Sequence, residues 1–363
     1  MNRVCFASRI TVVWIAAVAL SATSGSRAAA QQPQAPVRTV EFSYQVHFPA
    51  QLGATSPAYL WIPAPAARDG HQTIVPTGAR PAAGDISISS DAPHTVGKDA
   101  EYHNQFFEFH PSPAQVAAGF DATVRFTVTR QEYVVLHNGA VVPALVRAAA
   151  EPEELSRYLQ SDKLVPINGL IAQLAQQQTA GATTPLEKAR QIYDYVVSTM
   201  HYDKSGEGWG RGDAIWACDS KRGNCTDFHS LFIGMMRSVG IPARFEIGFP
   251  LPEGQSEGTI PGYHCWSEFY IEGIGWIPVD ASEASKHPAK KDYFFGALDD
   301  NRVLFTYGRD LRLSPEQQGP PLNYFIYPYA EIGGKPVKDL QTHFPFRDVA
   351  PAPPGDQARA NAK

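Results

Sequence analysis

The sequence predicts an α+β protein in which an all-β region comes first and a mixed region of helices and strands follows. Residues 37–147 contain repeated runs of β-branched and aromatic residues that are separated by Gly, Pro and Asp and show no helical period. From Ala148 to Met200, and again from Cys225 to Val239, apolar residues recur at three- and four-residue steps, as on a helix with one buried face. Strand-like runs return after residue 240. We therefore expect an antiparallel β-sandwich followed by a helix packed on an antiparallel sheet.

Length and composition are consistent with two globular domains. The chain has 363 residues, of which 44% are hydrophobic and 11% aromatic. Its formal net charge of −5 and pI near 6.1 give no electrostatic argument for binding nucleic acid or an anionic membrane. We expect a β-sandwich domain at residues 37–147, a second domain at 148–345, and no nucleic-acid partner.

Residues 1–30 have the three parts of a secretory signal peptide. Arg3 and Arg9 supply the positive charge, residues 10–20 the apolar core, and residues 28–30 a small-residue cleavage site. The apolar core is short for a membrane span, and no later stretch approaches the required length. We expect export to the periplasm or the medium, without stable membrane insertion after cleavage. A membrane anchor is the alternative.

The all-β region contains six predicted strands. The first covers residues 39–48, and its alternating apolar residues share one face, as in a half-buried strand: Val40, Phe42, Tyr44, Val46 and Phe48. The others are residues 58–62, 85–89, 104–109, 122–128 and 132–136. No catalytic constellation stands out here. The expected role is a scaffold for the second domain, and an unrecognised ligand site is the lesser alternative.

Three helices are predicted next, at residues 151–159, 167–177 and 185–200. The third begins with a capping box, in which Thr184 is the N-cap and Glu187 the third helical residue. Its apolar stripe is most simply part of the core. The glycine-rich residues 206–213 follow without a Walker lysine pattern, so a mobile loop at the rim of a site is favoured over nucleotide binding.

A helix predicted to begin at Cys225 is the centre of the second region. Apolar residues recur at helical spacing until Gly240 and Pro242 end the pattern. Unpaired N–H groups and the dipole at a helix N-terminus lower a thiol pKa, which makes thiolate available near neutral pH. The Cys225 N–H is also a candidate oxyanion donor. Cys225 is therefore a candidate nucleophile.

Two strand-like runs downstream carry a histidine and a carboxylate. Residues 262–271 predict one strand, a turn follows at residues 273–275, and residues 276–280 predict the next. Such a hairpin would place His264 and Asp280 on neighbouring strands. The carboxylate could then fix the tautomer of the imidazole.

Four motifs in this order resemble the transglutaminase-like superfamily of papain-type cysteine enzymes. They are GNCTDF at residues 223–228, GIPAR at 240–244, HCWSE at 264–268 and GWIPVD at 275–280. The resemblance covers residues from about 188 to 280. It implies a papain-like core with Cys225 as nucleophile, His264 as general base and acid, and Asp280 as the residue that orients His264.

Four further residues are candidates for substrate contact or for support of the site. In the resembled family an indole N–H before the nucleophile can help bind the oxyanion in some members. Neither Trp209 nor Trp216 can be assigned that role by spacing, and a packed aromatic is favoured for both. Tyr263 and Glu268 flank the histidine and are candidates only.

Signal cleavage would leave Cys218, Cys225 and Cys265, and an odd number indicates at least one free thiol. A bridge between Cys218 and Cys265 is the most plausible pairing. A Cys218–Cys225 disulfide or an inert buried Cys225 thiol is the structural alternative. A zinc site that includes Cys218, His229 and His264 is less favoured, because the spacing fits no common zinc pattern. No acidic calcium loop is evident, so we expect neither a metal nor a cofactor.

The expected reaction is attack of the Cys225 thiolate on a peptide or carboxamide carbonyl of a protein or peptide substrate, through an acyl-enzyme. Hydrolysis, by a protease or amidase, is favoured over amine transfer by a transglutaminase. The alternatives are a non-catalytic protein-binding module that retains the fold and a zinc-stabilised structural protein. The remaining predictions are strands at residues 293–296, 302–310 and 323–329, and a disordered tail at 350–363.

Overall fold

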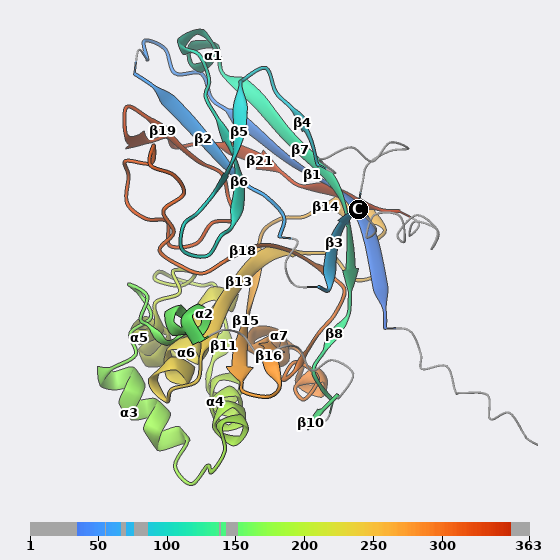
Figure 1. Cartoon of the computed structure of the whole chain (residues 1–363), viewed down its shortest axis with the longest axis vertical. Helices are drawn as coiled ribbons and strands as arrows, with labels where there is room; N and C mark the ends of the chain where they lie inside the picture. Colours follow the sequence, from blue (N-terminus) through green and yellow to red (C-terminus); the bar gives the residue numbers. More distant parts are fainter. Residues whose placement is uncertain are drawn as a thin grey trace, which may run out of the picture. The chain divides into compact units, whose positions relative to one another are not determined.

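The computed structural model describes residues 35–54, 56–66, 70–75, 86–137, 139–142 and 152–349. The predicted signal peptide and C-terminal tail lie outside these residues. From Ala35 onward the chain forms a single compact unit. Within it, two larger sheets lie together with the short helix of residues 113–118 beside them, and the helices of residues 152–286 gather around a smaller sheet (Figure 1).

Two sheets form the strand-rich part. The seven-stranded sheet has the order β14-β22-β1-β7-β3, with β21 also paired to β1 and β4 to β7. Its strands are β1 Val37–Phe48, β3 Gln72–Val75, β4 Ile86–Ser89, β7 Phe120–Gln131, β14 Glu257–Thr259, β21 Gln341–His343 and β22 Pro345–Asp348. The five-stranded sheet, β20-β19-β2-β6-β5, consists of β2 Ala58–Pro63, β5 His94–Lys98, β6 Gln105–Phe109, β19 Tyr329–Ile332 and β20 Lys335–Pro336.

The central pair of the larger sheet follows the predicted alternation. β1 and β7 run antiparallel along their whole length, from Val37 opposite Gln131 to Phe48 opposite Phe120. The five apolar residues predicted to share a face of β1 are all buried. They belong to the same buried cluster as Leu60 of β2, so the two sheets share one core. The predicted sandwich is confirmed.

A short helix interrupts the all-β region and was not predicted. α1, Pro113–Ala118, begins with a capping box between Ser112 and Gln115. Only Val116 in it is buried. The helix was missed because six residues are too few to show an apolar period. Strands β3 and β5 were also missed. The predicted strand at residues 132–136 is instead two short ones, β8 Tyr133–Val134 and β9 Leu136–His137.

The chain returns to the first two sheets near its end. β19 pairs with β2, and β21 and β22 both pair with β1. The predicted strand at residues 323–329 is wrong, since the strand begins at Tyr329, directly after a proline that cannot donate to a ladder. Residues 329–348 therefore pair with the sheets of the first region. The predicted domains, residues 37–147 and 148–345, stay a prediction. They assign β19 and β21 to the second domain, although both strands pair with strands of the first.

The second part is a four-stranded antiparallel sheet covered by helices. Its order is β16-β15-β13-β18, with β13 Ala243–Pro250, β15 His264–Ile271, β16 Gly275–Val279 and β18 Arg302–Tyr307. α6, Cys225–Ser238, packs on β13 and β15 and is buried from Cys225 to Arg237. The helices around it are α3 Gly169–Gln178, α4 Pro185–Thr199, α5 Ala214–Ser220 and α7 Ala281–Lys286.

The predicted capping box of α4 is confirmed, with Thr184 and Glu187 bonded reciprocally. The first predicted helix is α2 Pro152–Ser156 followed by the 3₁₀ turn η2 Arg157–Leu159. Helices α5 and α7 were not predicted, and residues 293–296 are not a strand. The remaining short elements are β10 Ala140–Val141, β11 His201–Tyr202, β12 Arg222–Gly223, η3 Pro288–Lys290 and β17 Ala297–Leu298.

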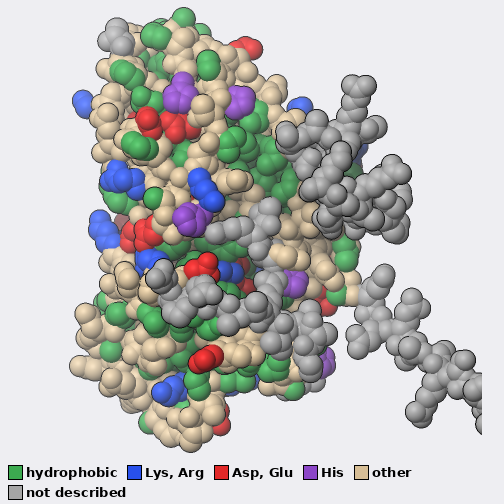
Figure 2. All heavy atoms as spheres, viewed as in Figure 1, with side chains coloured by type: hydrophobic (Ala, Val, Ile, Leu, Met, Phe, Trp, Pro, Cys, Tyr) green, Lys and Arg blue, Asp and Glu red, His purple; other side chains and the backbone are tan. Residues whose placement is uncertain are grey.

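An aromatic cluster joins the two parts. The ring of Phe42 in β1 lies 5.5 Å from that of Phe249 in β13 and 5.7 Å from that of Phe305 in β18. Phe249 and Phe305 meet edge to face at 5.2 Å. The sheet that carries the candidate site therefore rests on the sandwich. On the face shown in Figure 2, acidic and basic side chains are interspersed. Among the described helices, none combines the length and the apolar character needed to cross a membrane.

Candidate active site

Cys225 is the first residue of α6, and the sequence around it forms a complete helix cap. The Asn224 side chain accepts a hydrogen bond from the Thr226 N–H at 2.9 Å. The Asp227 carboxylate accepts one from the Asn224 N–H, also at 2.9 Å, which completes a capping box. The first N–H groups of a helix have no acceptor within the helix. The cap therefore fixes the positions of both the Cys225 thiol and the Cys225 backbone N–H.

Asp227 also binds the glycine-rich loop. Its carboxylate accepts hydrogen bonds from the N–H groups of Gly210 at 2.6 Å and Gly212 at 2.9 Å. Gly212 has a φ of 61°, and a Cβ there would lie 2.6 Å from the Ser230 hydroxyl oxygen, so the close approach requires glycine. Burial raises the pKa of Asp227, while the backbone hydrogen bonds oppose that shift. Residues 206–213 thus lie against the N-terminus of α6.

His264 opens β15, and Asp280 follows directly after β16. The strands pair antiparallel, with Ser267 opposite Val279. His264 Nε2 lies 2.7 Å from Asp280 Oδ2. The predicted hairpin is confirmed, and it brings the two side chains into hydrogen-bond contact.

Four groups donate to the Asp280 carboxylate, which is fully buried. Besides His264, Arg302 donates to Oδ2 at 3.1 Å, and the Ser282 hydroxyl and the Glu283 N–H each donate to Oδ1 at 3.0 Å. Burial alone would raise the pKa of Asp280, but the charges of His264 and Arg302 hold it well below its usual range. An ionised carboxylate in this position can orient the imidazole.

The Cys225 thiol and the His264 ring interact directly, while Nε2 of that ring faces Asp280. Burial raises the pKa of Cys225, but hydrogen bonds from Cys265 and His264 and the imidazolium charge outweigh it and keep the pKa well below its usual value. Burial lowers the pKa of His264, yet Asp280 and Cys225 raise it to about 10. Both shifts favour the thiolate–imidazolium form of the pair.

His229 lies one turn further along α6 and is fully buried. Its Nδ1 is 2.8 Å from the Cys225 carbonyl oxygen, and its Nε2 accepts a hydrogen bond from the Ala281 N–H at 3.1 Å. A ring nitrogen that accepts carries no proton, so Nδ1 is the donor and the imidazole is neutral. Burial also lowers the pKa of His229. His229 thus ties the first turn of α6 to the residue that follows Asp280.

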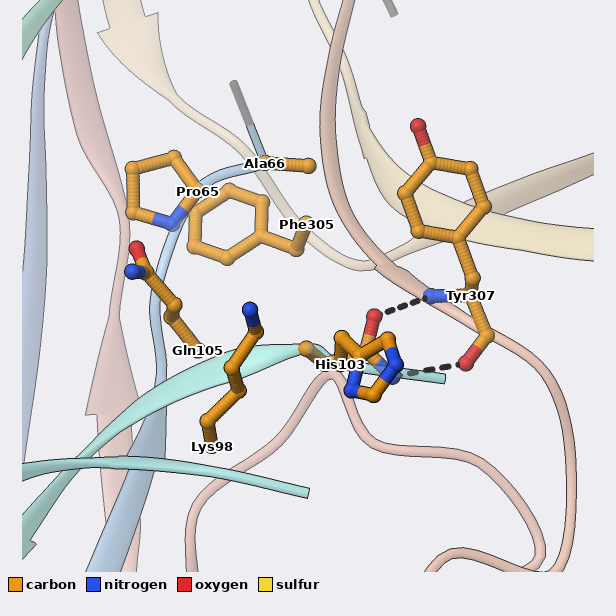
Figure 3. Close-up of a pocket in the computed structure, with 8 residues that line it drawn as sticks. Pro65, Ala66, Lys98, His103, Gln105, Phe305 and Tyr307 are labelled. Carbon is orange, nitrogen blue, oxygen red and sulfur yellow. Dashed lines mark hydrogen bonds between the residues drawn. The ribbon is translucent and has the colours of Figure 1, made fainter. Parts of the chain in front are cut away.

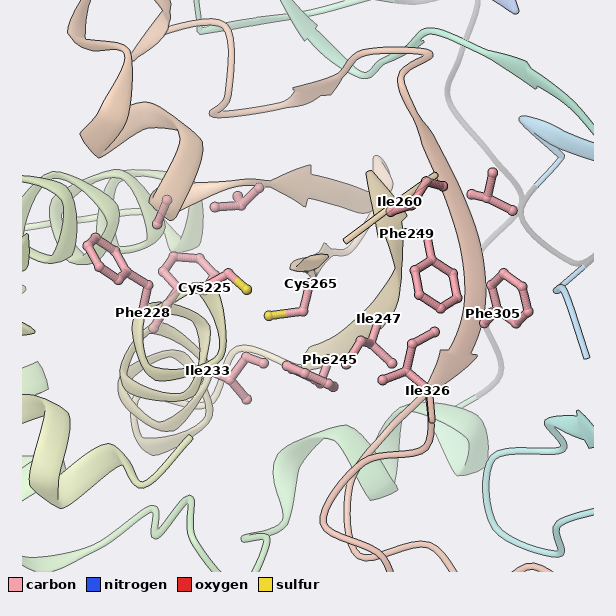
Figure 4. Packing of buried hydrophobic residues seen from close by; sticks show 14 of the residues in the cluster. Cys225, Phe228, Ile233, Phe245, Ile247, Phe249, Ile260, Cys265, Phe305 and Ile326 are labelled. Carbon is pink, nitrogen blue, oxygen red and sulfur yellow. The ribbon is translucent and has the colours of Figure 1, made fainter. Parts of the chain in front are cut away.

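Cys265 reaches the same place from β15. Its thiol donates a hydrogen bond to Thr226 Oγ1 at 3.7 Å, and its sulfur lies 3.8 Å from His229 Nδ1 and next to the Cys225 thiol. In Figure 4 the two sulfur atoms face each other between α6 and the sheet. The three cysteines of the described residues are free. The expectation of a bridge between Cys218 and Cys265 is wrong for this structure, because the sulfur of Cys265 is directed at Cys225.

Two of the accessory candidates have well-defined partners. The Tyr263 hydroxyl lies 2.9 Å from both Asn224 Nδ2 and Thr226 Oγ1, so it contacts the cap of the nucleophile's helix. The Glu268 carboxylate instead accepts a hydrogen bond at 2.7 Å from Arg244 on the neighbouring strand. The structure therefore brings Tyr263 to the site and places Glu268 in a buried ion pair.

The two tryptophan candidates pack within the preceding loop and helix. The Trp209 indole N–H donates to the Gly206 carbonyl at 3.1 Å. The Trp216 indole packs against Gly208, where a Cβ would lie 2.5 Å from the ring nitrogen, and Arg222 lies 5.6 Å from the centre of its ring. These contacts match the packed-aromatic interpretation of both residues.

Arg302 is the neighbour of the candidate triad that the sequence analysis missed. Its guanidinium donates to Asp280, and also to Asp299 at 2.9 Å, and it lies 4.9 Å from the centre of the Trp266 ring. Burial lowers the pKa of Arg302, but the carboxylates of Asp299 and Asp280 raise it by more than burial lowers it, so the guanidinium is charged. A lone arginine at the start of an apolar strand was the available signal.

Metal binding was the less favoured alternative for Cys218, His229 and His264. Among the described residues, no group of three His, Cys, Asp or Glu side chains is arranged to hold a metal ion.

A hollow of about 180 Å³ lies where Pro65 and Lys98 approach Phe305 and Tyr307 (Figure 3). The Asn104 side chain in its lining donates a hydrogen bond to the Tyr307 carbonyl oxygen and accepts one from the Tyr307 N–H, each at 2.8 Å. The hollow contains none of the candidate site residues.

Comparisons with known proteins agree with this geometry. A Haemophilus influenzae protein, described as uncharacterized, is 32% identical over 219 residues, which cover 52% of this chain and 59% of that protein. The uncharacterized protein YebA of Bacillus subtilis is 25% identical over 148 residues, 37% of this chain and 20% of its own length. The chain thus spans less than two thirds of each relative.

Among solved structures, an inferred cysteine protease from Cytophaga hutchinsonii is similar with a TM-score of 0.57 and 17% identity, over 88% of this chain and 94% of that one. This likeness shows a shared fold. The model of the transglutaminase-like superfamily matches residues 172–281, which include Cys225, His264 and Asp280. Residues 172–281 of this chain therefore form a domain of the transglutaminase-like superfamily.

Proposed function

We propose that the protein is a cysteine enzyme that hydrolyses peptide or carboxamide bonds of a protein or peptide substrate. The observation that supports this most strongly is the series of interacting side chains from Cys225, at the start of a buried helix, through His264 to Asp280, with a hydrogen bond between the last two. It combines a thiolate nucleophile, a proton carrier and an orienting carboxylate. His264 and, after it, Arg302 hold the pKa of that carboxylate well below its usual range.

The reaction follows from these positions. The Cys225 thiolate attacks the carbonyl carbon, and the charge that moves to the carbonyl oxygen is stabilised by the Cys225 N–H. His264 gives its proton to the leaving amine, the C–N bond breaks, and a thioester acyl-enzyme remains. His264 then takes a proton from water, whose oxygen attacks the thioester and releases the acid and the thiolate. An amine in place of water would give a new amide instead.

Hydrolysis is the preferred outcome because the similar solved structure from Cytophaga is described as an inferred cysteine protease, whereas the chemistry of the triad serves both outcomes. The test uses fluorescently labelled casein to detect cleavage and dansylcadaverine to detect amine incorporation. Cys225→Ser should abolish either activity, and the matched control Cys218→Ser should retain it. Incorporation without cleavage would replace hydrolysis by amine transfer.

The nucleophile assignment can be tested without a known substrate. An ordinary thiol, with a pKa of about 8.5, reacts only slowly with iodoacetamide below about pH 6. The Cys225 peptide should remain reactive there, and His264→Ala should remove this reactivity. Ordinary titration of Cys225 in the natural protein, with binding of a partner but no turnover, would favour a non-catalytic binding module.

The proposal includes export, on the basis of Arg3, Arg9 and the apolar and small-residue segments of residues 10–30. Expression of the full chain with a C-terminal tag in a Gram-negative host, followed by fractionation and N-terminal sequencing, tests this. A mature N-terminus at Gln31 in the periplasm is the expected result. An unprocessed N-terminus in the cytoplasm would contradict it.

A further inference from the structure

We propose that Cys225 and Cys265 form a reversible disulfide, which makes the candidate nucleophile a site of oxidative modification. Cys225 opens α6 and Cys265 is the second residue of β15, and the helix packs directly on this strand. The Cys265 sulfur lies within 3.7 Å of Thr226 Oγ1 and 3.8 Å of His229 Nδ1, both on the first turns of α6. Figure 4 shows its sulfur directed toward that of Cys225.

The two thiols differ in the way that disulfide formation requires. The lowered pKa of Cys225 favours its thiolate, the form that reacts with oxidants, while burial and the neighbouring Cys225 raise the pKa of Cys265 well above its usual value. Cys225 is 2% exposed and Cys265 is fully buried. A small oxidant that reaches the thiolate therefore meets Cys225 first, with Cys265 behind it as the resolving thiol.

Cys218 provides an internal comparison. It lies in α5, is partly exposed, and was the partner favoured by the sequence for Cys265. Burial and the charge of Asp219 raise its pKa, so it lacks the thiolate character of Cys225. Exposure alone would favour oxidation of Cys218. Thiolate character and the adjacent sulfur favour Cys225.

The oxidant class is a hydroperoxide, and the steps balance as follows. The Cys225 thiolate attacks the terminal peroxide oxygen, an S–O bond forms and the O–O bond breaks. The alkoxide, which is hydroxide when the oxidant is hydrogen peroxide, leaves and takes the His264 proton. The peroxide is thereby reduced by two electrons and Cys225 becomes a sulfenic acid. The Cys265 sulfur then attacks the Cys225 sulfur. The S–S bond forms, the S–O bond breaks, and hydroxide leaves and takes the Cys265 proton as water.

The disulfide would switch off any reaction that uses the Cys225 thiolate and would protect Cys225 from irreversible oxidation to sulfinic acid. A dithiol reductant would restore the free thiols by exchange. Because disulfide formation requires the two sulfur atoms and not a substrate, the inference does not depend on the proposed hydrolysis.

The experiment exposes the full-length protein to low concentrations of hydrogen peroxide, blocks remaining thiols with iodoacetamide and maps tryptic peptides by mass spectrometry. Trypsin separates Cys218, Cys225 and Cys265 into the peptides 212–221, 223–237 and 245–286. The expected product is peptide 223–237 linked to peptide 245–286, with peptide 212–221 alkylated. Dithiothreitol should return both linked peptides to the thiol form.

The variant Cys265→Ser tests the resolving role. It should give no linked product, and recovery of Cys225 alkylation after dithiothreitol should fall to about a tenth or less, because sulfenic acid proceeds to sulfinic acid. Cys218→Ser should behave as the natural protein. Oxidation of Cys225 in the natural protein to sulfinic acid without the linked peptide would overturn the inference, as would a linked peptide that contains Cys218. Both readouts are independent of casein cleavage, so failure of the proposed function remains distinguishable.

Discussion

β1 and β15 are both inner strands of antiparallel sheets, yet they are buried in different ways. β1 buries one face, with Phe42 and Tyr44 in the core, and most of its other face is only partly buried. β15 is buried on both faces from His264 to Tyr270 and includes buried polar residues such as Ser267. Burying polar groups costs free energy unless partners satisfy them. The sandwich thus shows burial that serves stability, while the sheet under α6 also buries polar groups that serve chemistry.

The electrostatic contrast has the same origin. The core of β1 and β7 is held by apolar area and ring contacts such as Phe42 with Phe126, whose centroids are 5.2 Å apart. Around α6 the charges of Asp280, His264 and Arg302 are buried and depend on one another. Losing an apolar side chain weakens the fold, whereas losing one charge leaves its partners unpaired.

Replacing Cys225 should have the largest effect on activity. Cys225→Ser removes the thiolate while preserving shape, so turnover should fall by about 10³-fold or more, with the melting temperature changed little. Activity measurements and calorimetry on the same sample test this. Phe42→Ala, in the sandwich, should show the opposite pattern, and equal losses of activity in the two variants would erase the distinction between the regions.

Phe42→Ala and Arg302→Met should lower stability by similar amounts for different reasons. The first leaves a cavity and should cost about 3–5 kcal/mol. The second leaves the buried Asp280 carboxylate without one of its cations and should also cost about 3–5 kcal/mol. Urea unfolding measures both. Below the unfolding transition, only Arg302→Met should slow alkylation of Cys225, so an equal slowing by Phe42→Ala would contradict the contrast.

The pH dependence should show the coupling of the buried charges. The pKa of Cys225 is lowered and that of His264 is raised to about 10. The thiolate–imidazolium pair should therefore persist until the pH approaches about 10, where His264 loses its proton. As pH rises through about 10 the imidazolium loses the proton that the leaving amine needs, and kcat/KM should fall about tenfold per pH unit. In Asp280→Asn, the alkaline limb should move to lower pH, because the charge that raised the pKa of His264 is gone. An unchanged alkaline limb would exclude His264 as the titrating acid.

The smallest effects should come from the two capping boxes. Thr184→Ala in α4 and Asn224→Ala in α6 should each cost about 1 kcal/mol, as loss of an N-cap does. Only the Asn224 variant should also slow alkylation of Cys225, because that cap holds the nucleophile. Thermal unfolding and alkylation rates, compared between the two variants, test this. Slowing by Thr184→Ala would mean that the effect reflects helix stability in general.

Elements with a local signal were predicted well. The alternation in β1, the capping box of α4 and the hairpin between β15 and β16 each depend on residues close together in the chain. α1 and α5 were missed, since helices of six and seven residues are too short to show a period. The capping box of Asn224 and Asp227 was not predicted, although its two residues are only three positions apart in the chain.

The sequence by itself determined which residues could act as nucleophile, base and orienting carboxylate, because a helix start and a hairpin place Cys225, His264 and Asp280 through neighbouring residues. Only the tertiary structure decided that Cys265 faces Cys225, that Arg302 holds Asp280, and that residues 329–348 return to the first sheets. These contacts join segments tens to hundreds of residues apart. Periods and caps act over a few residues, whereas such pairings depend on the path of the whole chain and on the shared core that closes it.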